Sequence, residues 1–362
     1  MVWITWRAAM QEALYGSRGF YASGQHPAAH FRTSVHASPR YAAAMLALLR
    51  DVDESLGHPD RLDLVDIGAG RGELLTQMLI MARHFPAQPA GPATPSFTQR
   101  ISPHAVEITP RPEGLDRQIQ WHRSVPSRIT GLVIANEWLD NIPLDVVELA
   151  GDGPRLVLVH TATGAERTGP LAGAADQAWQ RRWWPLRHIG DHAEIGRPRS
   201  AAWADVIGRL DRGLALGADY GHVRASRPAL GTLAGYRDGR QVRPVPDGSR
   251  DITAHVALDA CAAAGEAAAC AAAGEAAACA AAGASSGARI VLTTQREALR
   301  ALGLRGSRPP LALARTDPPG YLAALRQAAE EAELTDPGGL GAFNWLLQAV
   351  RMPLPASLGC HG

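Results

Sequence analysis

Three closely spaced glycines after an apolar stretch are the residues whose type and spacing most strongly suggest ligand binding. The stretch Leu62–Ile67 predicts a buried strand, and a helical run begins at Glu73. Between them lie Gly68, Gly70 and Gly72. Glycines between a strand and a helix let the backbone turn tightly and let a ligand approach the helix N-terminus without a Cβ in the way. The dinucleotide fingerprint G-x-G-x-x-G would need a third glycine where Glu73 stands.

The observed spacing, G-x-G-x-G with an acidic residue two positions before the first glycine, resembles motif I of class I S-adenosylmethionine (SAM) methyltransferases. Asp66 is that acidic residue, and we expect it to orient the turn. In such folds an acidic residue that ends the second strand accepts hydrogen bonds from ribose hydroxyls. Glu107, in H-A-V-E-I, is the candidate for this role. The alternative for Glu107 is an ordinary surface carboxylate at a strand end.

A polar cluster follows a further apolar stretch, G-L-V-I-A, which predicts a strand over 131–135. Asn136, Glu137 and Asp140 lie directly after it, in N-E-W-L-D-N-I-P. Ligands of open α/β sheets bind beyond the carboxyl ends of the strands, so we expect these side chains to border the reaction. Glu137 could hold a guanidinium by a bidentate pair, which would leave a nitrogen lone pair directed at a methyl donor. In the alternative interpretation, Asn136 caps a following helix and Asp140 only solvates it.

The composition narrows the classes of function. The 362 residues are 46% hydrophobic and 20% charged, which allows a sizeable core, and the formal net charge is +1. This balance gives no sign of a nucleic-acid-binding surface. All 36 basic residues are Arg, and the lack of Lys excludes Schiff-base, Walker A and Ser-Lys mechanisms.

The cysteines and the apolar stretches lead to further expectations. The 4 cysteines lie in the last third of the chain, three of them in an Ala-rich nonapeptide repeat over 260–286, so we expect neither a disulfide framework nor a metal site. No stretch approaches ~18 uninterrupted apolar residues, and the first residues lack a secretory signal. We therefore expect a cytoplasmic protein with no membrane segment.

The order of motifs along nearly the whole chain resembles the MidA-like SAM-dependent methyltransferases, whose mitochondrial member is an arginine methyltransferase that assists respiratory complex I assembly. The motifs are M-Q-E-A-L-Y-G-S-R-G-F-Y (10–21), H-F-R-T (30–33), D-I-G-A-G-R-G (66–72), N-E-W-L-D-N-I-P (136–143), A-D-Y-G-H (218–222), G-T-L (231–233) and D-I-T-A-H-V (251–256). His30 stands where the family usually has Asp, and Asp66 where it usually has Glu.

This resemblance implies a class I methyltransferase (Rossmann-like) α/β sheet. It places an N-terminal helical extension at 1–60 and a methyltransferase domain with inserted substrate-side elements at 61–362. It implies SAM as the cofactor, held by Asp66, Gly68, Gly70, Gly72 and Glu107. It also implies methylation of arginine on a partner protein, for which a respiratory-complex subunit is a candidate, with Asn136, Glu137 and Asp140 as the catalytic residues.

Other residues and other functions stay open at this point. Asp219, His222 and Asp251 are candidates for the substrate-side wall, although for His222 and His255 a structural role is the stronger interpretation. One alternative function is a non-catalytic assembly factor that retains the fold. A less favoured one is an NAD-dependent oxidoreductase.

The remaining patterns predict the elements that position these residues. The opening segment, 3–21, is expected to form a helix that ends near Gly16. Further helices are expected over 38–56, 73–84, 201–211, 295–302, 321–334 and 343–350. Strands are expected over 104–108, 119–122, 214–219 and 289–293, with a hairpin formed by 145–149 and 155–161. An irregular loop is expected over 86–103, and no elements are predicted over 163–200.

Overall fold

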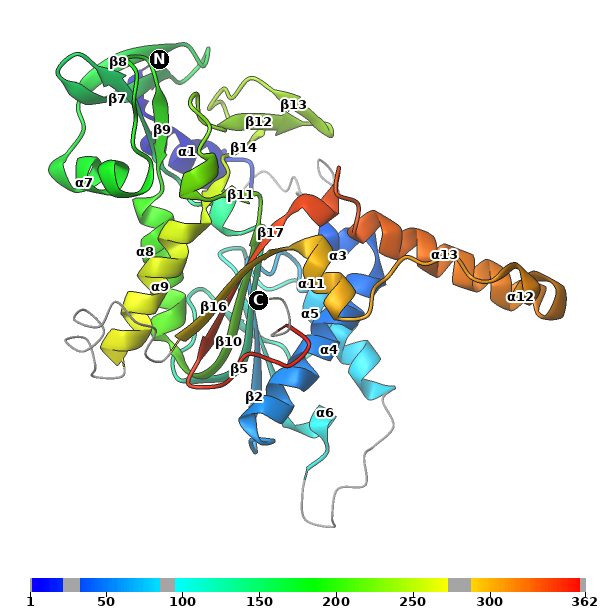
Figure 1. Cartoon of the computed structure of the whole chain (residues 1–362). Coiled ribbons are helices and arrows are strands. Elements are labelled where there is room, and N and C mark those ends of the chain that lie inside the picture. Colours follow the sequence, from blue (N-terminus) through cyan, green and yellow to red (C-terminus); the bar gives the residue numbers. More distant parts are fainter. Residues whose placement is uncertain (1, 22–32, 85–94, 273–287, 359–362) are drawn as a thin grey trace. The chain divides into compact units, whose positions relative to one another are not determined.

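The computed structural model describes residues 2–21, 33–84, 95–272 and 288–358 (Figure 1). The chain forms two compact units, each built from three stretches of sequence. The large unit consists of Thr33–Asn136, Ile207–Ala218 and Ala269–Gly362, and the small unit of Met1–Arg32, Glu137–Val206 and Asp219–Ala268. The chain therefore passes between the units several times, and the domain division expected at residue 60 stays a prediction.

A seven-stranded sheet forms the centre of the large unit, in the order β16-β17-β10-β5-β2-β3-β4. The pairs β10–β5, β5–β2, β2–β3 and β3–β4 are parallel, and β16–β17 is antiparallel. The first five strands along the chain thus have the 3-2-1-4-5 order of a doubly wound sheet, whose direction of winding reverses between β2 and β5. The strands are β2 (Leu62–Ile67), β3 (Ile101–Val106), β4 (Gln120–His122), β5 (Ile129–Asn136), β10 (Leu210–Asp219), β16 (Ala288–Thr294) and β17 (Asn344–Val350).

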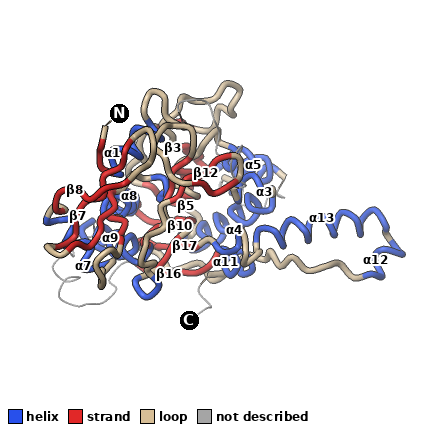
Figure 2. Tube along the Cα trace, turned by 90° about the horizontal axis from the view of Figure 1, so that it is seen from above, coloured by secondary structure: helices blue, strands red, loops and turns tan. Residues whose placement is uncertain are grey.

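Helices of the large unit bury an apolar core against this sheet. In Figure 1, α4 (Pro39–Leu56) lies beside α5 (Glu73–Arg83), and both contribute to the largest hydrophobic cluster, together with β2 and β5. Ser38 caps α4 by accepting the Arg40 N–H at 3.0 Å, and Pro39 occupies its first turn, which agrees with the helix expected over 38–56. The other helices are α3 (Ser34–Ala37), α6 (Phe97–Arg100), α11 (Gln295–Ala301), α12 (Leu311–Thr316) and α13 (Pro318–Leu334). Figure 2 shows α12 beside α13.

The small unit contains a five-stranded antiparallel sheet, including the predicted hairpin. Its strands are β1 (Trp3–Thr5), β6 (Asp145–Ala150), β7 (Gly153–His160), β8 (Glu166–Leu171) and β9 (His192–Ile195). The helix α1 (Trp6–Tyr15) buries Trp6, Met10 and Leu14 and ends at Gly16, as its spacing predicts. Further elements are α7 (Ala174–Trp183), β11 (Gly221–His222), β12 (Ala234–Arg237), β13 (Arg240–Val242), β14 (Asp251–Thr253) and β15 (Val256–Ala257).

Two helices, α8 (Arg197–Gly208) and α9 (Leu258–Ala272), begin in the small unit and end in the large unit. The α9 helix contains the start of the Ala-rich repeat, and Ala260 and Cys261 are buried. Cys261 is a free thiol, whereas Cys270 is disulfide-bonded, which the repeat did not predict. No helix of the described residues is long and apolar enough to cross a membrane.

Three of the predicted elements differ from the structure. The helix expected from Trp3 begins only at Trp6, since Trp3–Thr5 form the strand β1 and pair with β7. Residues 344–350 form the inner strand β17 and not a helix, because six of its seven residues are buried, and a short apolar run has no periodicity that separates a buried strand from a helix. Of the irregular loop expected over 86–103, residues 86–94 lie outside the described residues, and the last part is not irregular. Ser96 and Gln99 form a capping box at α6, and β3 then begins at Ile101 despite containing Pro103.

Candidate functional site

The glycine turn lies between β2 and α5, at the carboxyl edge of the large sheet. Gly68, Gly70 and Gly72 have φ angles of 71°, 57° and 82°, in the left-handed region that residues with a Cβ rarely adopt. The N–H groups of Gly68 and Ala69 donate to the Val106 carbonyl at 2.9 and 3.3 Å, which ties the turn to the end of β3. The three glycines are therefore required by the backbone, as the sequence predicts.

Glu107 directly follows β3 and contacts the glycine turn. Its Oε2 accepts the Gly70 N–H at 3.1 Å, and its Oε1 accepts the N–H groups of Ile108 and Thr109 at 2.7 and 3.1 Å. The structure thus brings Glu107 together with the turn, as expected for a residue that shares a ligand with it. These hydrogen bonds hold the carboxylate in one orientation at the strand end.

Asp66 lies on β2 with only 4% of its surface exposed. Burial raises its pKa to about 8, and the nearby charges of Glu73 and Glu107 raise it further in the same direction. At neutral pH Asp66 is therefore mainly a neutral carboxylic acid, which can both donate and accept a hydrogen bond. The sequence placed it beside the turn but did not predict its protonation.

The space around the turn fits the amino-acid end of SAM. A Cβ built at Gly70 would have a single near neighbour, Glu73 Oε2 at 3.3 Å, so the backbone is open on this side. The helix α5 begins at Glu73, and its N-cap residue, Gly72, has no side chain to cap it, so its N-terminal N–H groups favour a carboxylate such as that of the methionine part. Gly68, Gly70 and Gly72 would hold this end, and Glu107 would hold the ribose.

Asn136 and Glu137 follow at the end of β5, the strand beside β2. The Asn136 Oδ1 accepts the Tyr41 hydroxyl at 2.7 Å. The cap residue of the next helix, Leu139–Asn141, is Trp138, so the alternative in which Asn136 caps that helix is wrong. Glu137 has a φ of 53°, which costs a residue with a Cβ about 1 kcal/mol or more. Such strain clusters at functional sites, so the Glu137 backbone supports a functional role for this position.

Asp140 belongs to a buried polar network in the small unit. Its N–H donates to Asp219 Oδ1 at 3.2 Å, and its Oδ2 accepts the Thr253 hydroxyl at 3.0 Å. Arg199, also buried, donates to the Asp140 backbone carbonyl and to three further carbonyls, those of Ile142, Ala254 and His255. Since Arg199 is occupied by backbone carbonyls, it orders the chain around Asp140 without forming a direct ion pair with its carboxylate.

Three carboxyl groups of this network are buried and incompletely bonded. Asp140, Asp219 and Asp251 are 7%, 0% and 3% exposed. In each of them one oxygen has no hydrogen-bond partner within the described residues, namely Asp140 Oδ1, Asp219 Oδ2 and Asp251 Oδ1. Burial raises the pKa of all three, that of Asp251 to about 8, and the charge of Asp140 adds to the rise at Asp219. The charge of buried Arg199 opposes this rise at Asp140 and Asp219, and the carboxyl groups of these two residues also interact by a side-chain hydrogen bond.

The two histidines have structural surroundings. His222 Nδ1 lies 2.6 Å from Arg227 Nη1, and burial together with the Arg227 charge lowers its pKa to about 3. The His255 ring stacks on Tyr220 with centroids 5.6 Å apart. His222 is therefore neutral and held in place, in agreement with the structural role that the sequence favoured.

The G-T-L motif also has a structural explanation. Gly231 has a φ of 76°, and the N–H groups of Thr232 and Leu233 donate to the buried Glu194 carboxylate. The Thr232 hydroxyl both donates to Glu194 and accepts the His255 N–H. The motif therefore connects the β9 strand to the segment that carries Asp251.

The sequence analysis missed several residues of these networks. They are Tyr41, Glu194, Arg199 and Thr253. Arg199 is one of 36 basic residues and lies 59 positions from Asp140, so no local pattern could have singled it out. Within the described part of the chain, no group of three or more His, Cys, Asp or Glu side chains could hold a metal ion.

Comparisons with known proteins agree with the cofactor predicted from the turn. A family described as "Putative S-adenosyl-L-methionine-dependent methyltransferase" matches residues 47–276. A COG1565 superfamily member from Burkholderia thailandensis, bound to S-adenosyl-homocysteine, has a similar fold, with a TM-score of 0.74 and 22% identity over 99% of this chain and 91% of that one. An uncharacterized COG1565 superfamily protein from the same organism has a TM-score of 0.73 and 23% identity, over 99% of this chain and 91% of that one. No curated protein matches the chain. The α/β fold and SAM as the cofactor are thereby confirmed.

Proposed function

This chain belongs to a family of SAM-dependent methyltransferases, and on that premise we propose that it methylates an arginine side chain of a partner protein. The order of motifs that resembles the MidA-like proteins supports this acceptor, and a respiratory-complex subunit is the candidate partner that the resemblance suggests. The geometry of the small unit supports it independently, through its excess of buried carboxyl groups.

The single observation that carries the proposal is the set of unpartnered oxygens on Asp140, Asp219 and Asp251. Buried polar atoms without partners cost free energy, on the order of 1–3 kcal/mol each, unless a ligand supplies the missing hydrogen bonds. A guanidinium offers five N–H donors and a positive charge, so it would satisfy several of these oxygens at once. Its charge would also favour the ionised form of carboxyl groups whose pKa is raised by burial.

Glu137 would bind the reacting nitrogen. Burial raises the pKa of Tyr220 to about 12, and the charges of Glu137 and Asp140 add to the rise, so both carboxylates act electrostatically on this phenol. The Glu137 carboxylate would form a charge-assisted pair with the guanidinium and hold the nitrogen for in-line attack. Asn136, held by the Tyr41 hydroxyl, would border the acceptor nitrogen on the same side as Glu137.

SAM supplies an activated methyl group on a sulfonium. In the proposed reaction the acceptor nitrogen forms a bond to the methyl carbon, the carbon–sulfur bond breaks with its electron pair staying on sulfur, and the nitrogen loses a proton. Glu137 would receive that proton. The protein otherwise contributes positioning and electrostatic complementarity, which are the main requirements of such a displacement.

Methyl transfer to short peptides tests this acceptor. The protein is incubated with SAM carrying an isotopically labelled methyl group and with peptides that contain one Arg, or Lys or citrulline at the same position. Mass spectrometry should find the label on the Arg peptide only. Label on the Lys peptide instead would contradict the arginine assignment. SAM binding without transfer to any peptide, or to proteins of a cell extract, would favour the non-catalytic assembly factor.

A further inference from the structure

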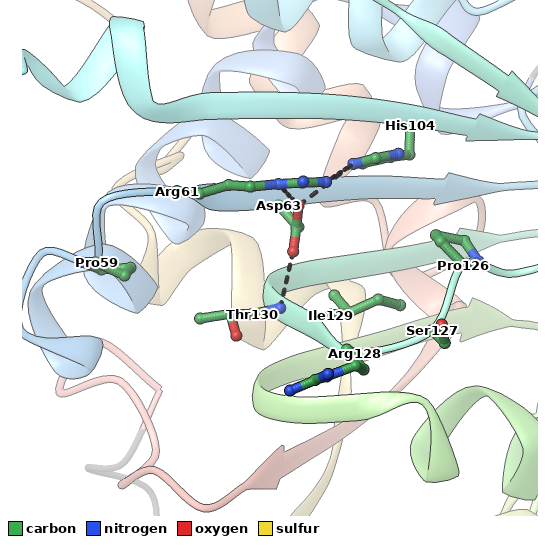
Figure 3. A pocket seen from close by; sticks show the side chains of 9 residues that line it. All are labelled: Pro59, Arg61, Asp63, His104, Pro126, Ser127, Arg128, Ile129 and Thr130. Atoms are coloured by element: carbon green, nitrogen blue, oxygen red, sulfur yellow. Dashed lines mark hydrogen bonds and ion pairs between the residues drawn. The ribbon is translucent and has the colours of Figure 1, made fainter.

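A second candidate site lies at the amino ends of the parallel strands of the large sheet, whereas the glycine turn lies at their carboxyl ends. A cavity of about 370 Å³ opens where β2 and β5 begin, and Figure 3 shows the side chains that line it. The glycine turn follows the other end of β2, six residues away, which corresponds to about 20 Å along a strand. The cavity is therefore separate from the residues proposed to hold SAM. Its volume is in the range of small-molecule sites, roughly 300–1,000 Å³.

The base of the cavity is a carboxylate whose two oxygens are both occupied. Asp63 is 6% exposed, and its Oδ2 accepts the Thr130 N–H at 2.9 Å. Its Oδ1 accepts the Arg61 Nε–H at 2.8 Å and lies 3.3 Å from His104 Nε2. Asp63 thus contacts Arg61, His104 and the Thr130 backbone, and its ion pair with Arg61 holds that guanidinium at the cavity.

Two guanidinium groups then remain to face a ligand. Arg61 Nη2 lies 3.1 Å from His104 Nε2, while Nη1 has no hydrogen bond within the described residues. Arg128 makes neither a hydrogen bond nor an ion pair with any part of the chain that the structure describes, and its φ of 60° is left-handed. In Figure 3, Arg61 and Arg128 lie on opposite sides of the Asp63–Thr130 hydrogen bond. Two positive charges thus border the cavity against one carboxylate, which is ion-paired with Arg61.

From this arrangement we infer that the cavity binds a small organic anion, whose phosphate or carboxylate group is held between Arg61 and Arg128. Guanidinium groups suit both kinds of oxyanion, because their planar N–H groups pair with two oxygens at once. Pro59 and Pro126 also line the cavity and provide apolar surface for the rest of the molecule. An inorganic ion would not use this apolar surface, so an anionic group attached to an organic body fits the lining better.

Calorimetric titration of the full-length protein tests the inference with three probes of similar size. Phenyl phosphate and benzoate carry the two candidate oxyanions, and benzyl alcohol is neutral. At least one anion should bind, and benzyl alcohol should bind at least about tenfold more weakly. The anion that binds with the higher affinity identifies the oxyanion group that the site prefers. Binding of neither anion, or equal binding of benzyl alcohol, would overturn the inference.

Arginine variants locate the binding. Arg128→Gln should weaken anion binding by about tenfold or more, and because Arg128 makes no hydrogen bond within the described chain, this variant should fold normally. Arg61→Gln should act in the same direction. Arg326→Gln, at an exposed position on α13, is the matched control and should leave affinity unchanged. All three should bind SAM like the unmodified protein. Unchanged anion affinity in both Arg128→Gln and Arg61→Gln would show that the anion binds elsewhere.

Discussion

Replacing Asp66 by Asn should change how the stability of the protein depends on pH. Asp66 has a pKa of about 8 in the folded protein, against an ordinary value of 3.8. Because the folded-state pKa is raised, the stability linked to this group is fully present below about pH 4 and is lost as the pH rises to about 8. Each pKa unit corresponds to about 1.36 kcal/mol, so the full loss is on the order of 5 kcal/mol. Asn is neutral throughout and avoids this loss.

The measurement is urea unfolding, followed by tryptophan fluorescence, of the unmodified protein and of Asp66→Asn at several values between about pH 5 and pH 8. The free energy of unfolding of Asp66→Asn should exceed that of the unmodified protein by an amount that grows with pH over this whole range. A difference that stays constant with pH would refute the protonated state of Asp66.

Asp63→Asn is a control of opposite sign on the same strand. Burial raises the pKa of Asp63, but hydrogen bonds from His104, the Thr130 N–H and Arg61 together lower it below its ordinary value. A lowered pKa gives stability that is present above the unfolded-state value and is lost as the pH falls. Asp63→Asn should therefore be most destabilising at neutral pH, and its effect should shrink on acidification.

Three other variants test the fold and the cofactor site. Gly70→Val should lower SAM affinity by more than a hundredfold in calorimetry, whereas Gly57→Val, which has the same left-handed strain but open space around it, should bind SAM normally; equal affinity of the two would exclude the turn as the site. Arg100→Gln should lower the free energy of unfolding by about 3–5 kcal/mol, because it leaves the buried Asp53 without the partner it contacts at 2.5 and 2.7 Å; a loss below about 1 kcal/mol in urea unfolding would contradict this. Tyr41→Phe removes the hydrogen bond to Asn136 and should slow methyl transfer by up to about tenfold; an unchanged rate would remove Asn136 from the site.

Local sequence signals were enough to predict the centre of the large unit. The apolar run at Leu62–Ile67, the Ser38–Pro39 helix start and the spacing of the three glycines each depend on a few consecutive residues. Glu107 was placed correctly beside the turn because strand ends in a parallel sheet meet at one edge. The roles assigned to Glu137 and Asp140 remain predictions.

The missed features depend on contacts between distant parts of the chain. The strand β17 owes its form to β16, with which it pairs over its whole length, and nothing in its own residues excludes a helix. Asp140 and Asp219 meet across 79 positions, and their raised pKa values come from burial that no local pattern reveals. The same holds for the two units, which are assembled from alternating stretches of sequence.

The rate of methyl transfer by Glu137→Gln tests the arginine proposal most directly. This variant keeps the size of the side chain and removes its charge, so the charge-assisted pair with a guanidinium should weaken by roughly 1.5–3 kcal/mol. Transfer of labelled methyl to the Arg peptide, measured with saturating SAM, should therefore fall by about tenfold to more than a hundredfold. SAM affinity in a parallel titration should change little. Undiminished transfer by Glu137→Gln would contradict the guanidinium role, and a parallel loss of SAM binding would assign Glu137 to the cofactor instead.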